Sequence, residues 1–582
     1  MGFEHWALRS ACWLSSALTL TACANDPRLF ALRPPVVRDQ DLDPVRVECS
    51  AEAAKPVKQG VKAAACMPEP YESSFAWDGA DNIVFRPIAK FFQAESVGEA
   101  ENVNAFDEVP DSSWFRNRIG MRPQSDAEVA SGFCAEGPEL KADAADGSWL
   151  IDHGKDNGAN PGFRIKVDGT KYMLKTDDWQ VERATAATAI AARLYYAAGW
   201  WAACDSVVYF KRSTLKLKPG LTIKANVGPI QKFDEKLLDK MLSATAKRGD
   251  RYRAVASRWL PGNAIGPFSY EGTRDDDPAD TVKHENRRDL RGARLIAAWL
   301  NHFDSREQNT MSTWMPSDPK DPKSPGYVRH WYIDLGDCFG SEWTVDGFSR
   351  RLGHAYVLDF NYVLEDFVTF GALERPWERA HHTPGAQNFG YFSERDFDPD
   401  LWRGEYPNPA FGRMTEHDGA WATRIIARFT PENVRAAVSV GNFTDPHHTE
   451  WLTSVLLQRQ HAILQRYFSK LSPLADVRVD GRQFCATDLA RKTHTFPEAS
   501  FHYGATVSYG GAEPIPLPAA LSASGETCVS LPLVALARSL PDNARERYVV
   551  LRVSNGVAPA PLAAHFYDLG PERGLRLVGI ER

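Results

Sequence analysis

The chain has 582 residues, of which 43% are apolar and 25% carry a charge, a composition typical of globular proteins. The formal net charge is -7 and both signs are mixed along the sequence, so the charge pattern gives no reason to expect nucleic acid as a partner. A chain of this length is expected to form several domains or one large elaborated domain.

The N-terminus is typical of a secretion signal. Ala11 to Ala22 is a short apolar segment that is too short to span a bilayer but has the length of a signal-peptide core. It ends in Leu20-Thr21-Ala22-Cys23, which resembles a bacterial lipobox. Residues 1–22 are therefore expected to be a lipoprotein signal peptide and Cys23 the lipidated residue. A plain secretory signal with a chance Cys is the alternative.

The residue after Cys23 bears on the location of the protein. Ala24, rather than Asp, follows the cysteine, and by resemblance to lipoprotein sorting in two-membrane bacteria this favours the outer membrane. The expected location is the cell envelope, with the membrane as a partner through the lipid on Cys23. Residues 23–75 are rich in Pro, Ala and charge with little periodicity, and predict a flexible tether.

Seven cysteines follow Cys23, namely Cys49, Cys66, Cys134, Cys204, Cys338, Cys485 and Cys528. None of them forms a Cys-x-x-Cys pair, which argues against a zinc site. In an oxidising envelope, Cys49 with Cys66 and Cys485 with Cys528 are expected to form disulfides. Because seven is odd, at least one thiol is free. Cys204 and Cys338 have apolar neighbours and are expected to be small buried residues.

Residues 154 to 210 predict the order glycines, strand, strand, helix, strand. Gly158 and Gly162 precede a strand over 163–167, and Asp168-Gly169 is a strong hairpin signal. The second strand ends at Lys175. The segment 181–198 has apolar residues at helical spacing and stops at Gly199, a favourable helix end. A further apolar strand covers 206–210.

The remainder predicts a helical region followed by a β-rich one. Residues 230 to 300 are predicted to be largely helical, ending in a helix over 287–300. Residues 310–314 and 327–334 predict a hairpin, and 453–467 an amphipathic helix. After Pro473, short strands separated by Gly and Pro predict a small β-sandwich-like domain over 473–582.

Two motifs lie at the ends of the predicted hairpin. The first is Asn301-His302-Phe303-Asp304-Ser305-Arg306-Glu307-Gln308-Asn309, and the second is Tyr332-Ile333-Asp334-Leu335-Gly336. The order His-x-Asp-(x)4-Asn and then Asp-x-Gly suits phosphoryl transfer. In such a site one Asp orients the attacking hydroxyl, and an Asn and a second Asp hold metal ions on the nucleotide phosphates.

The whole set of motifs resembles the protein-kinase-like superfamily. The glycine-rich hairpin, Lys175, the helix, His302-to-Asn309 and Asp334-Leu335-Gly336 occur in that order. The likeness is to the atypical branch with HipA-type, phosphoinositide-type and secreted kinases, and more closely to a group of uncharacterised bacterial lipoproteins. It covers roughly residues 150 to 470.

This resemblance implies a fold. The expected class is α+β, a two-lobed kinase-like fold with a small C-terminal β-rich domain. The kinase-like body would cover 76–472, with an N-lobe at about 150–215 and a C-lobe at about 216–472.

The resemblance also implies roles, with ATP and Mg2+ as cofactors. Asp304 would be the catalytic Asp that accepts the substrate proton, and Arg306 would replace the loop cation that steadies the transferring phosphoryl group. Asn309 and Asp334 would ligate Mg2+, because hard cations prefer oxygen ligands. Lys175 would contact the α- and β-phosphates as a point charge.

The glycines and the acid partner of the lysine complete the implied site. Gly158 and Gly162 would let backbone amides approach the phosphates. The helix after Lys175 carries Glu182 in its first turn and no acid at mid-helix positions such as Thr188. Glu182 either pairs with Lys175 or favours the helix N-terminus through the dipole.

Three other features have more than one interpretation. Phe303 replaces the Arg common in conventional kinases, so activation by loop phosphorylation is not implied. His302 is expected to be a structural histidine. The charged run 284–289 is either a substrate or phosphate patch or a salt-bridged helix start.

Two functions follow from the sequence. The first is an envelope-anchored, Mg-dependent phosphotransferase acting on an unknown hydroxyl acceptor, or an AMP transferase on the same scaffold. The second is a catalytically idle kinase-like lipoprotein that binds glycan or protein at the cell surface. The scarcity of ATP in the periplasm favours the second, and the retained Asp304, Asn309 and Asp334 favour the first.

Overall fold

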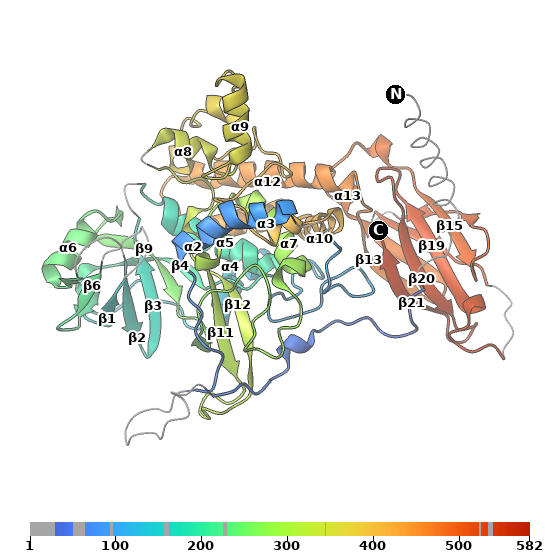
Figure 1. The fold of residues 1–582 in the computed structure, drawn as a ribbon, viewed down its shortest axis with the longest axis horizontal. Coiled ribbons are helices and arrows are strands. Elements are labelled where there is room, and N and C mark those ends of the chain that lie inside the picture. Colours follow the sequence, from blue (N-terminus) through green and yellow to red (C-terminus); the bar gives the residue numbers. More distant parts are fainter. Residues whose placement is uncertain are drawn as a thin grey trace, which may run out of the picture.

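The computed structural model describes residues 29–49, 65–92, 97–155, 162–177, 180–224, 230–343, 345–522, 525–533 and 539–582. The signal peptide, Cys23 and Gly158 lie outside these residues. The chain is 31% helix and 23% strand, in agreement with the predicted α+β class. Figure 1 shows a β unit at one end, helices in the middle and a second β unit at the C-terminal end.

The first β unit is a seven-stranded sheet with the order β4-β9-β3-β2-β1-β5 and β8 paired to β9. The Asp168-Gly169 turn has positive φ at both residues, which joins β2 to β3 as predicted. The strands are β1 (Trp149–Gly154), β2 (Gly162–Val167), β3 (Thr170–Lys175), β4 (Asp205–Phe210), β5 (Leu215–Leu217), β8 (Lys247–Arg248) and β9 (Arg251–Arg258). A separate pair is formed by β6 (Thr222–Lys224) and β7 (Ile230–Lys232).

Strand β9 corrects two predictions. Residues 251–258 were expected to be helical, and the first lobe was expected to end at about 215. Instead β9 pairs with both β3 and β4, so the sheet continues to Arg258. Ala254 and Ala256 alternate into the sheet core. The strand is rich in Ala and Arg, which favour helices, and the pairing on both sides overrides that local preference.

A helix covers each side of this region. The helix α6 (Glu235–Ser243) places Leu238 and Leu242 in the core of the sheet. The helix α5 (Arg183–Ala198) contacts β4 and β9 and is almost entirely buried, because its small alanines allow close packing on every side. It ends at Gly199, which has a φ of 130° and terminates the helix as predicted.

The middle of the molecule is a helical core. Its longest helix, α12, contains the predicted amphipathic segment 453–467. The helix α7 packs against α10 and α12 and shares a large apolar core with α5. The helices are α4 (Asp126–Ser131), α7 (Arg288–Leu300), α10 (Glu416–Ile426), α11 (Pro431–Ser439) and α12 (Pro446–Phe468).

The charged start of α7 has a structural role. Arg288 donates to Asp418 and forms an ion pair with Asp107, and Arg291 also reaches Asp418. Arg288, Arg291 and Asp418 are buried and the side chain of Asp107 is 12% exposed, so these groups satisfy one another within the protein. The structure therefore supports the salt-bridged helix start for 284–289, although its partners lie far away in the sequence.

The C-terminal unit is the predicted β-sandwich-like domain. Its sheets, β13-β14-β18-β17 and β16-β15-β19-β20-β21, are antiparallel and contribute to one apolar core. The strands are β13 (Leu474–Asp480), β14 (Gln483–Asp488), β15 (Gly504–Tyr509), β16 (Ile515–Leu517), β17 (Ala520–Leu521), β18 (Glu526–Ser530), β19 (Tyr548–Ser554), β20 (Leu562–Asp568) and β21 (Leu575–Glu581). A short helix, α13 (Leu489–Lys492), follows β14.

The described part of the expected tether lies against the body instead. Phe30 packs into the C-terminal unit beside Tyr548 and Tyr567. Further along, the Asp39 amide donates to the Asp111 carbonyl at 2.7 Å, and Val45 pairs with Gly326. Apolar residues spaced along the Pro-rich segment hold it to the surface, so residues 29–49 are not a free linker.

Three disulfides occur in the described residues. Cys49–Cys66 and Cys485–Cys528 are formed as predicted. Cys204, expected to be an unpaired buried residue, is bonded to Cys134 across 70 residues. Cys338 is the buried free thiol. Within the described residues no helix has the length and apolar character needed to cross a bilayer.

Candidate functional site

The hairpin brings the two motifs together. Strands β11 (Thr310–Pro316) and β12 (Gly326–Tyr332) pair from Thr310 opposite Tyr332 to Pro316 opposite Gly326, with β10 (Asn263–Ala264) on the outer edge. The Ile333 amide donates to the Asn309 carbonyl at 3.1 Å, so the end of the first motif meets the start of the second. The predicted hairpin is confirmed, and it places Asn309 next to the Asp334 segment.

The end of α7 shapes the loop that carries Asp304. Asn301 adopts a left-handed conformation with a φ of 50°, and the His302 amide donates to the Ala297 carbonyl at 2.8 Å. A helix that ends in this way turns sharply, and Asn tolerates the left-handed backbone well. The loop therefore leaves the buried helix directly at the hairpin.

Asp304 is surrounded by the residues predicted beside it. The Asn309 amide nitrogen donates to the Asp304 carbonyl at 2.8 Å and to its Oδ2 at 2.5 Å. The Arg306 guanidinium lies 2.6 Å from Oδ1 of Asp304 and also contacts the Glu405 carboxylate. The loop thus brings Asp304, Arg306 and Asn309 into one hydrogen-bonded group.

The environment of Asp304 makes its carboxylate more basic. Only 7% of the residue is exposed, and burial raises its pKa well above the ordinary value. The Arg306 charge opposes this rise, and the charges of Asp337 and Glu405 add to it. A carboxylate with a raised pKa is better suited to accept a proton from a hydroxyl.

Lys175 and Asp334 form the second half of the site. The Lys175 Nζ, at the end of β3, lies 2.6 Å from Oδ1 of Asp334. The Lys175 charge is the largest cause of the lowered pKa of Asp334. Asp334 has a φ of 55°, and its side chain is 41% exposed while that of Lys175 is 13% exposed. The carboxylate is therefore charged and open on one side.

Glu182 does not pair with Lys175. It lies at the start of α5 with a φ of 68°, and its carboxylate accepts hydrogen bonds from the Thr444 amide at 2.9 Å and the Thr444 hydroxyl at 2.5 Å. Arg253 lies 3.8 Å away. The left-handed backbone directs the side chain toward α12, so the proposed Lys175–Glu182 pair is wrong for this conformation, and Asp334 takes that place. The position of Glu182 at the start of α5 agrees with the alternative interpretation, in which its charge favours the helix N-terminus.

Gly162 has a packing reason to be glycine. A Cβ atom there would lie 2.5 Å from the Leu174 carbonyl oxygen of the neighbouring strand, which is closer than atoms approach. The predicted contact with phosphates is not needed to explain the residue. Gly158, its predicted companion, is outside the described residues.

The second motif packs directly on α5. Arg183 donates to the Gly336 carbonyl at 2.9 Å and lies 3.8 Å from Asp337. A Cβ atom on Gly336 would lie 3.2 Å from the Thr188 hydroxyl, so the mid-helix position faces this motif. Thr188 is small enough to let the segment approach, which an acidic side chain would prevent.

Four further residues of the site were missed from the sequence. Lys155 follows β1, and burial and then the neighbouring Lys175 lower its pKa to about 8. Asp205, buried at the start of β4, and Asp337 both act electrostatically on Lys175. Glu405 binds Arg306 from a distant loop. Lys155 could have been found from the sequence, because it lies at the end of a strand just before the predicted glycines. Nothing in the neighbouring sequence pointed to Asp205, Asp337 or Glu405.

His302 is buried as a structural residue. Its Nδ1 lies 2.9 Å from the Tyr195 hydroxyl, and its burial is complete. Burial lowers the pKa of His302 to about 3, so the imidazole is neutral in the folded protein. It holds the loop to α5 and takes no proton in the neutral pH range.

This neutral histidine predicts a pH-dependent stability. The unfolded imidazole binds a proton below about pH 6.5, whereas the folded one does not, so stability is present above that pH and lost as the pH falls. Between pH 6.5 and 5 the expected loss is roughly 2 kcal/mol. Urea titrations at both pH values should show this loss reduced in His302→Gln and unchanged in His502→Gln, an exposed histidine. Equal losses in all three proteins would contradict it.

An N-terminal segment borders the loop on its outer side. The helix α2 (Phe75–Ala80) begins at Phe75, whose ring lies 4.4 Å from the Arg306 guanidinium. Before it, Tyr71 and Ser73 donate to Glu307 at 3.0 and 2.8 Å. Within α2, Asp78 accepts from Gln308 at 3.1 Å. Residues 71–78 therefore cover part of the approach to Asp304.

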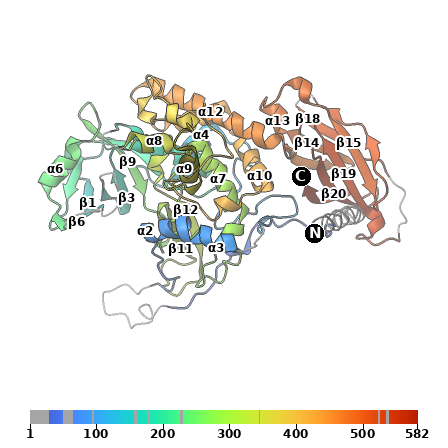
Figure 2. The same ribbon diagram turned by 45° about the horizontal axis from the view of Figure 1, so that its top comes forward.

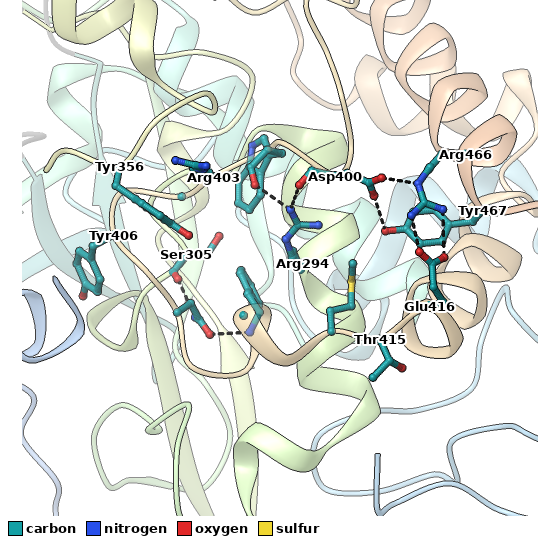
Figure 3. A pocket seen from close by; sticks show the side chains of 16 residues that line it. Arg294, Ser305, Tyr356, Asp400, Arg403, Tyr406, Thr415, Glu416, Arg466 and Tyr467 are labelled. Atoms are coloured by element: carbon teal, nitrogen blue, oxygen red, sulfur yellow. Dashed lines mark hydrogen bonds and ion pairs between the residues drawn. The ribbon is translucent and has the colours of Figure 1, made fainter. Parts of the chain in front are cut away.

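A polar pocket of about 340 Å³ lies next to the loop that carries Asp304 (Figure 3). Ser305 forms part of its wall, and Arg294 points toward the carbonyl oxygens near Asp400. Arg466 is held by Asp400 and Glu416, as the dashed lines show. The two carboxylates neutralise Arg466, and the guanidinium of Arg294 is occupied by backbone carbonyl oxygens.

Asp334 and Asn309 are the predicted Mg2+ ligands. Asp334 offers an exposed carboxylate, and Asn309 turns its amide oxygen away from Asp304 because the nitrogen donates there. Among the described residues, no group of three or more His, Cys, Asp or Glu side chains is arranged to hold a metal ion. Comparisons with family models, curated proteins and solved structures found no match to this chain.

Proposed function

We propose that the protein is an envelope-anchored, Mg-dependent phosphotransferase of the kinase-like kind, which transfers a phosphoryl group from a nucleotide to a hydroxyl acceptor. The observation that carries the proposal is the contact of Lys175 with Asp334 at 2.6 Å, across 159 residues of sequence. A strand lysine, a left-handed Asp and the Asp304 loop meet at one place in the order that phosphoryl transfer requires.

Each residue has a role in this proposal. Lys175, freed from Asp334, would bind phosphate oxygens, and Asp334 with Asn309 would hold Mg2+, which neutralises the phosphate charge. Asp304 would orient the acceptor hydroxyl and take its proton, while Arg306 would face the transferring group. Lys155 adds a second cation beside Lys175. Glu405 restrains the Arg306 side chain.

The fold supports the two-lobed arrangement in this proposal. The first sheet carries Lys175 at the end of β3, and α5 connects that sheet to the Asp334 motif through Arg183. The Asp304 loop belongs to the helical part. A nucleotide bound between the first sheet and the helical part would contact both of them. In this proposal the N-lobe extends to Arg258 and the C-lobe follows it.

A second candidate is the catalytically idle lipoprotein that binds glycan or protein. Two observations favour it: Asp304 is nearly buried beside residues 71–78, and Lys175 is paired with Asp334 instead of Glu182. AMP transfer on the same scaffold is a third outcome, which the choice of label distinguishes.

The proposal is tested by nucleotide-dependent stabilisation. Mg2+ with ATP at 100 times the dissociation constant is expected to stabilise the protein by about 2.7 kcal/mol, an increase in melting temperature of a few degrees. Asp334→Ala should lose this shift, and Asp480→Ala, an exposed Asp in the C-terminal unit, should keep it. Transfer of γ-label identifies a kinase, and transfer of α-label an AMP transferase. No shift and no label transfer with ATP or GTP would refute the proposal.

A further inference from the structure

Helix α9 (Phe360–Thr369) exposes its apolar side. None of its residues is buried. Its apolar side chains recur at helical spacing on one face, while Glu365 and Asp366 lie on the other. We define the α9 apolar face as Phe360 (55% exposed), Val363 (52%), Leu364 (62%), Phe367 (79%), Val368 (66%) and the following Phe370 (96%).

The polar side of α9 is the side that is held. Arg375 lies 3.2 Å from Glu365 and 2.9 Å from Asp366, and its guanidinium lies 4.3 Å from the Tyr362 ring. Arg375 itself is nearly buried. An ordinary surface helix buries its apolar stripe and turns its charges to water. Helix α9 instead packs its acidic side against Arg375 and turns its apolar side to solvent.

Such an arrangement indicates that the apolar face has a binding partner. Contiguous apolar patches of this kind on a soluble surface mark interaction sites. The helices α8 (Asp346–Arg351) and α9 project from the helical middle of the molecule (Figures 1 and 2). The exposed fractions of the apolar side chains leave the α9 apolar face open to a partner.

We propose that the α9 apolar face inserts into the hydrocarbon boundary of a phospholipid bilayer. The face presents only Phe, Val and Leu side chains, with no donor or acceptor for a polar partner. Interfacial helices bind bilayers through this kind of surface. Residues 345–380 contain six carboxylates and four arginines, so attraction to anionic lipid is not the driving force.

The chain length from Cys23 supports a bilayer as the occupant, and here the inference rests on the lipid anchor of the proposed function. Seven peptide units connect Cys23 to Phe30, which is packed in the C-terminal unit. They span at most about 25 Å when fully extended. An anchored protein is therefore held close to the membrane. Binding of a second surface to the same membrane then costs little additional entropy.

The location of the face connects it to the candidate site. The segment before α9 is joined to the Asp304 loop, because the Val357 amide donates to the Glu405 carbonyl at 2.8 Å and the Glu405 amide donates to the Phe303 carbonyl at 2.7 Å. Phe303 precedes Asp304. Insertion of α9 would place this loop near the lipid surface.

The test uses vesicles of neutral phosphatidylcholine and phosphatidylethanolamine in 0.5 M NaCl. The mature chain from residue 23 carries Cys23→Ser, so that no lipid anchor contributes. We expect flotation with the vesicles, and at least a tenfold weaker partition for Leu364→Gln/Phe367→Gln. Both side chains are exposed, so the fold should be unaffected. Ile515→Gln, an exposed apolar residue at 54% on the C-terminal unit, is the matched control and should bind normally.

A second measurement locates the contact. A fluorophore on Phe370→Cys should be quenched by brominated lipid, and one on Ile515→Cys should not. No flotation in neutral vesicles, binding that requires anionic lipid and low salt, or self-association through α9 without lipid would each overturn the proposal. Neither assay contains nucleotide, so a failure here is separate from a failure of the Mg-ATP shift.

Discussion

Replacing Asp304 with Asn is expected to lower nucleotide turnover by about 10²- to 10⁴-fold, the range that a general base contributes. The carboxylate is buried, its pKa is raised, and Arg306 and Asn309 hold it in place. An amide fills the same space but cannot take a proton from the acceptor. The rate of label release or transfer, measured at saturating Mg-ATP, checks this expectation.

The same variant separates catalysis from binding. Asp304→Asn should keep the Mg-ATP thermal shift, because Lys175, Asn309 and Asp334 are unchanged. The matched control is Asp480→Asn, which should keep both shift and rate. A rate within threefold of the wild type would remove Asp304 from its proposed role. Loss of the shift together with the rate would give the residue a structural role instead.

Replacing Asp418 with Ala is expected to lower the free energy of unfolding by about 3–5 kcal/mol, the cost of removing one partner of a buried ion pair. Asp418 is 0% exposed and accepts from Arg288 at 3.1 Å and Arg291 at 3.5 Å. Its side chain also completes the capping box of α10 with Thr415. The change leaves two buried guanidinium groups with fewer partners and removes a helix cap.

Urea and thermal unfolding measure this effect, with Glu416→Ala as the control. Glu416 lies in the same first turn of α10, but it forms an exposed ion pair with Arg466. Its loss is expected to cost less than about 1 kcal/mol. Similar effects from the two substitutions would show that the buried network contributes little to stability.

The features predicted correctly from the sequence are those specified by neighbouring residues. The end of α5 at Gly199 and the β2–β3 turn at Asp168-Gly169 follow from backbone preferences that act within a few residues. The β11–β12 hairpin joins strands whose facing ends, Pro316 and Gly326, are ten positions apart, and the Pro, Asp, Lys and Ser residues of the connecting turn indicated the pairing. The meeting of Asn309 with the Asp334 segment followed from that hairpin alone.

The features predicted wrongly depend on distant parts of the chain. Glu182 binds Thr444, which is 262 residues away, and its own left-handed backbone gave no signal in the sequence. Cys134 and Cys204 are joined because the fold brings them together, not because of their spacing. Strand β9 was hidden by alanines and arginines, whose helical preference was overridden by pairing on both sides.

The docking of the N-terminal segment on the C-terminal unit determines the order in which the protein can fold. The Phe30 amide donates to the Tyr548 hydroxyl at 2.9 Å, and the Tyr567 hydroxyl donates to the Phe30 carbonyl at 3.1 Å. These contacts join residues 518 and 537 positions apart. They cannot form until β19 and β20 have been synthesised, although domains generally fold from the N-terminus during synthesis. The first described residues of the chain therefore reach their final place only after the last domain has folded.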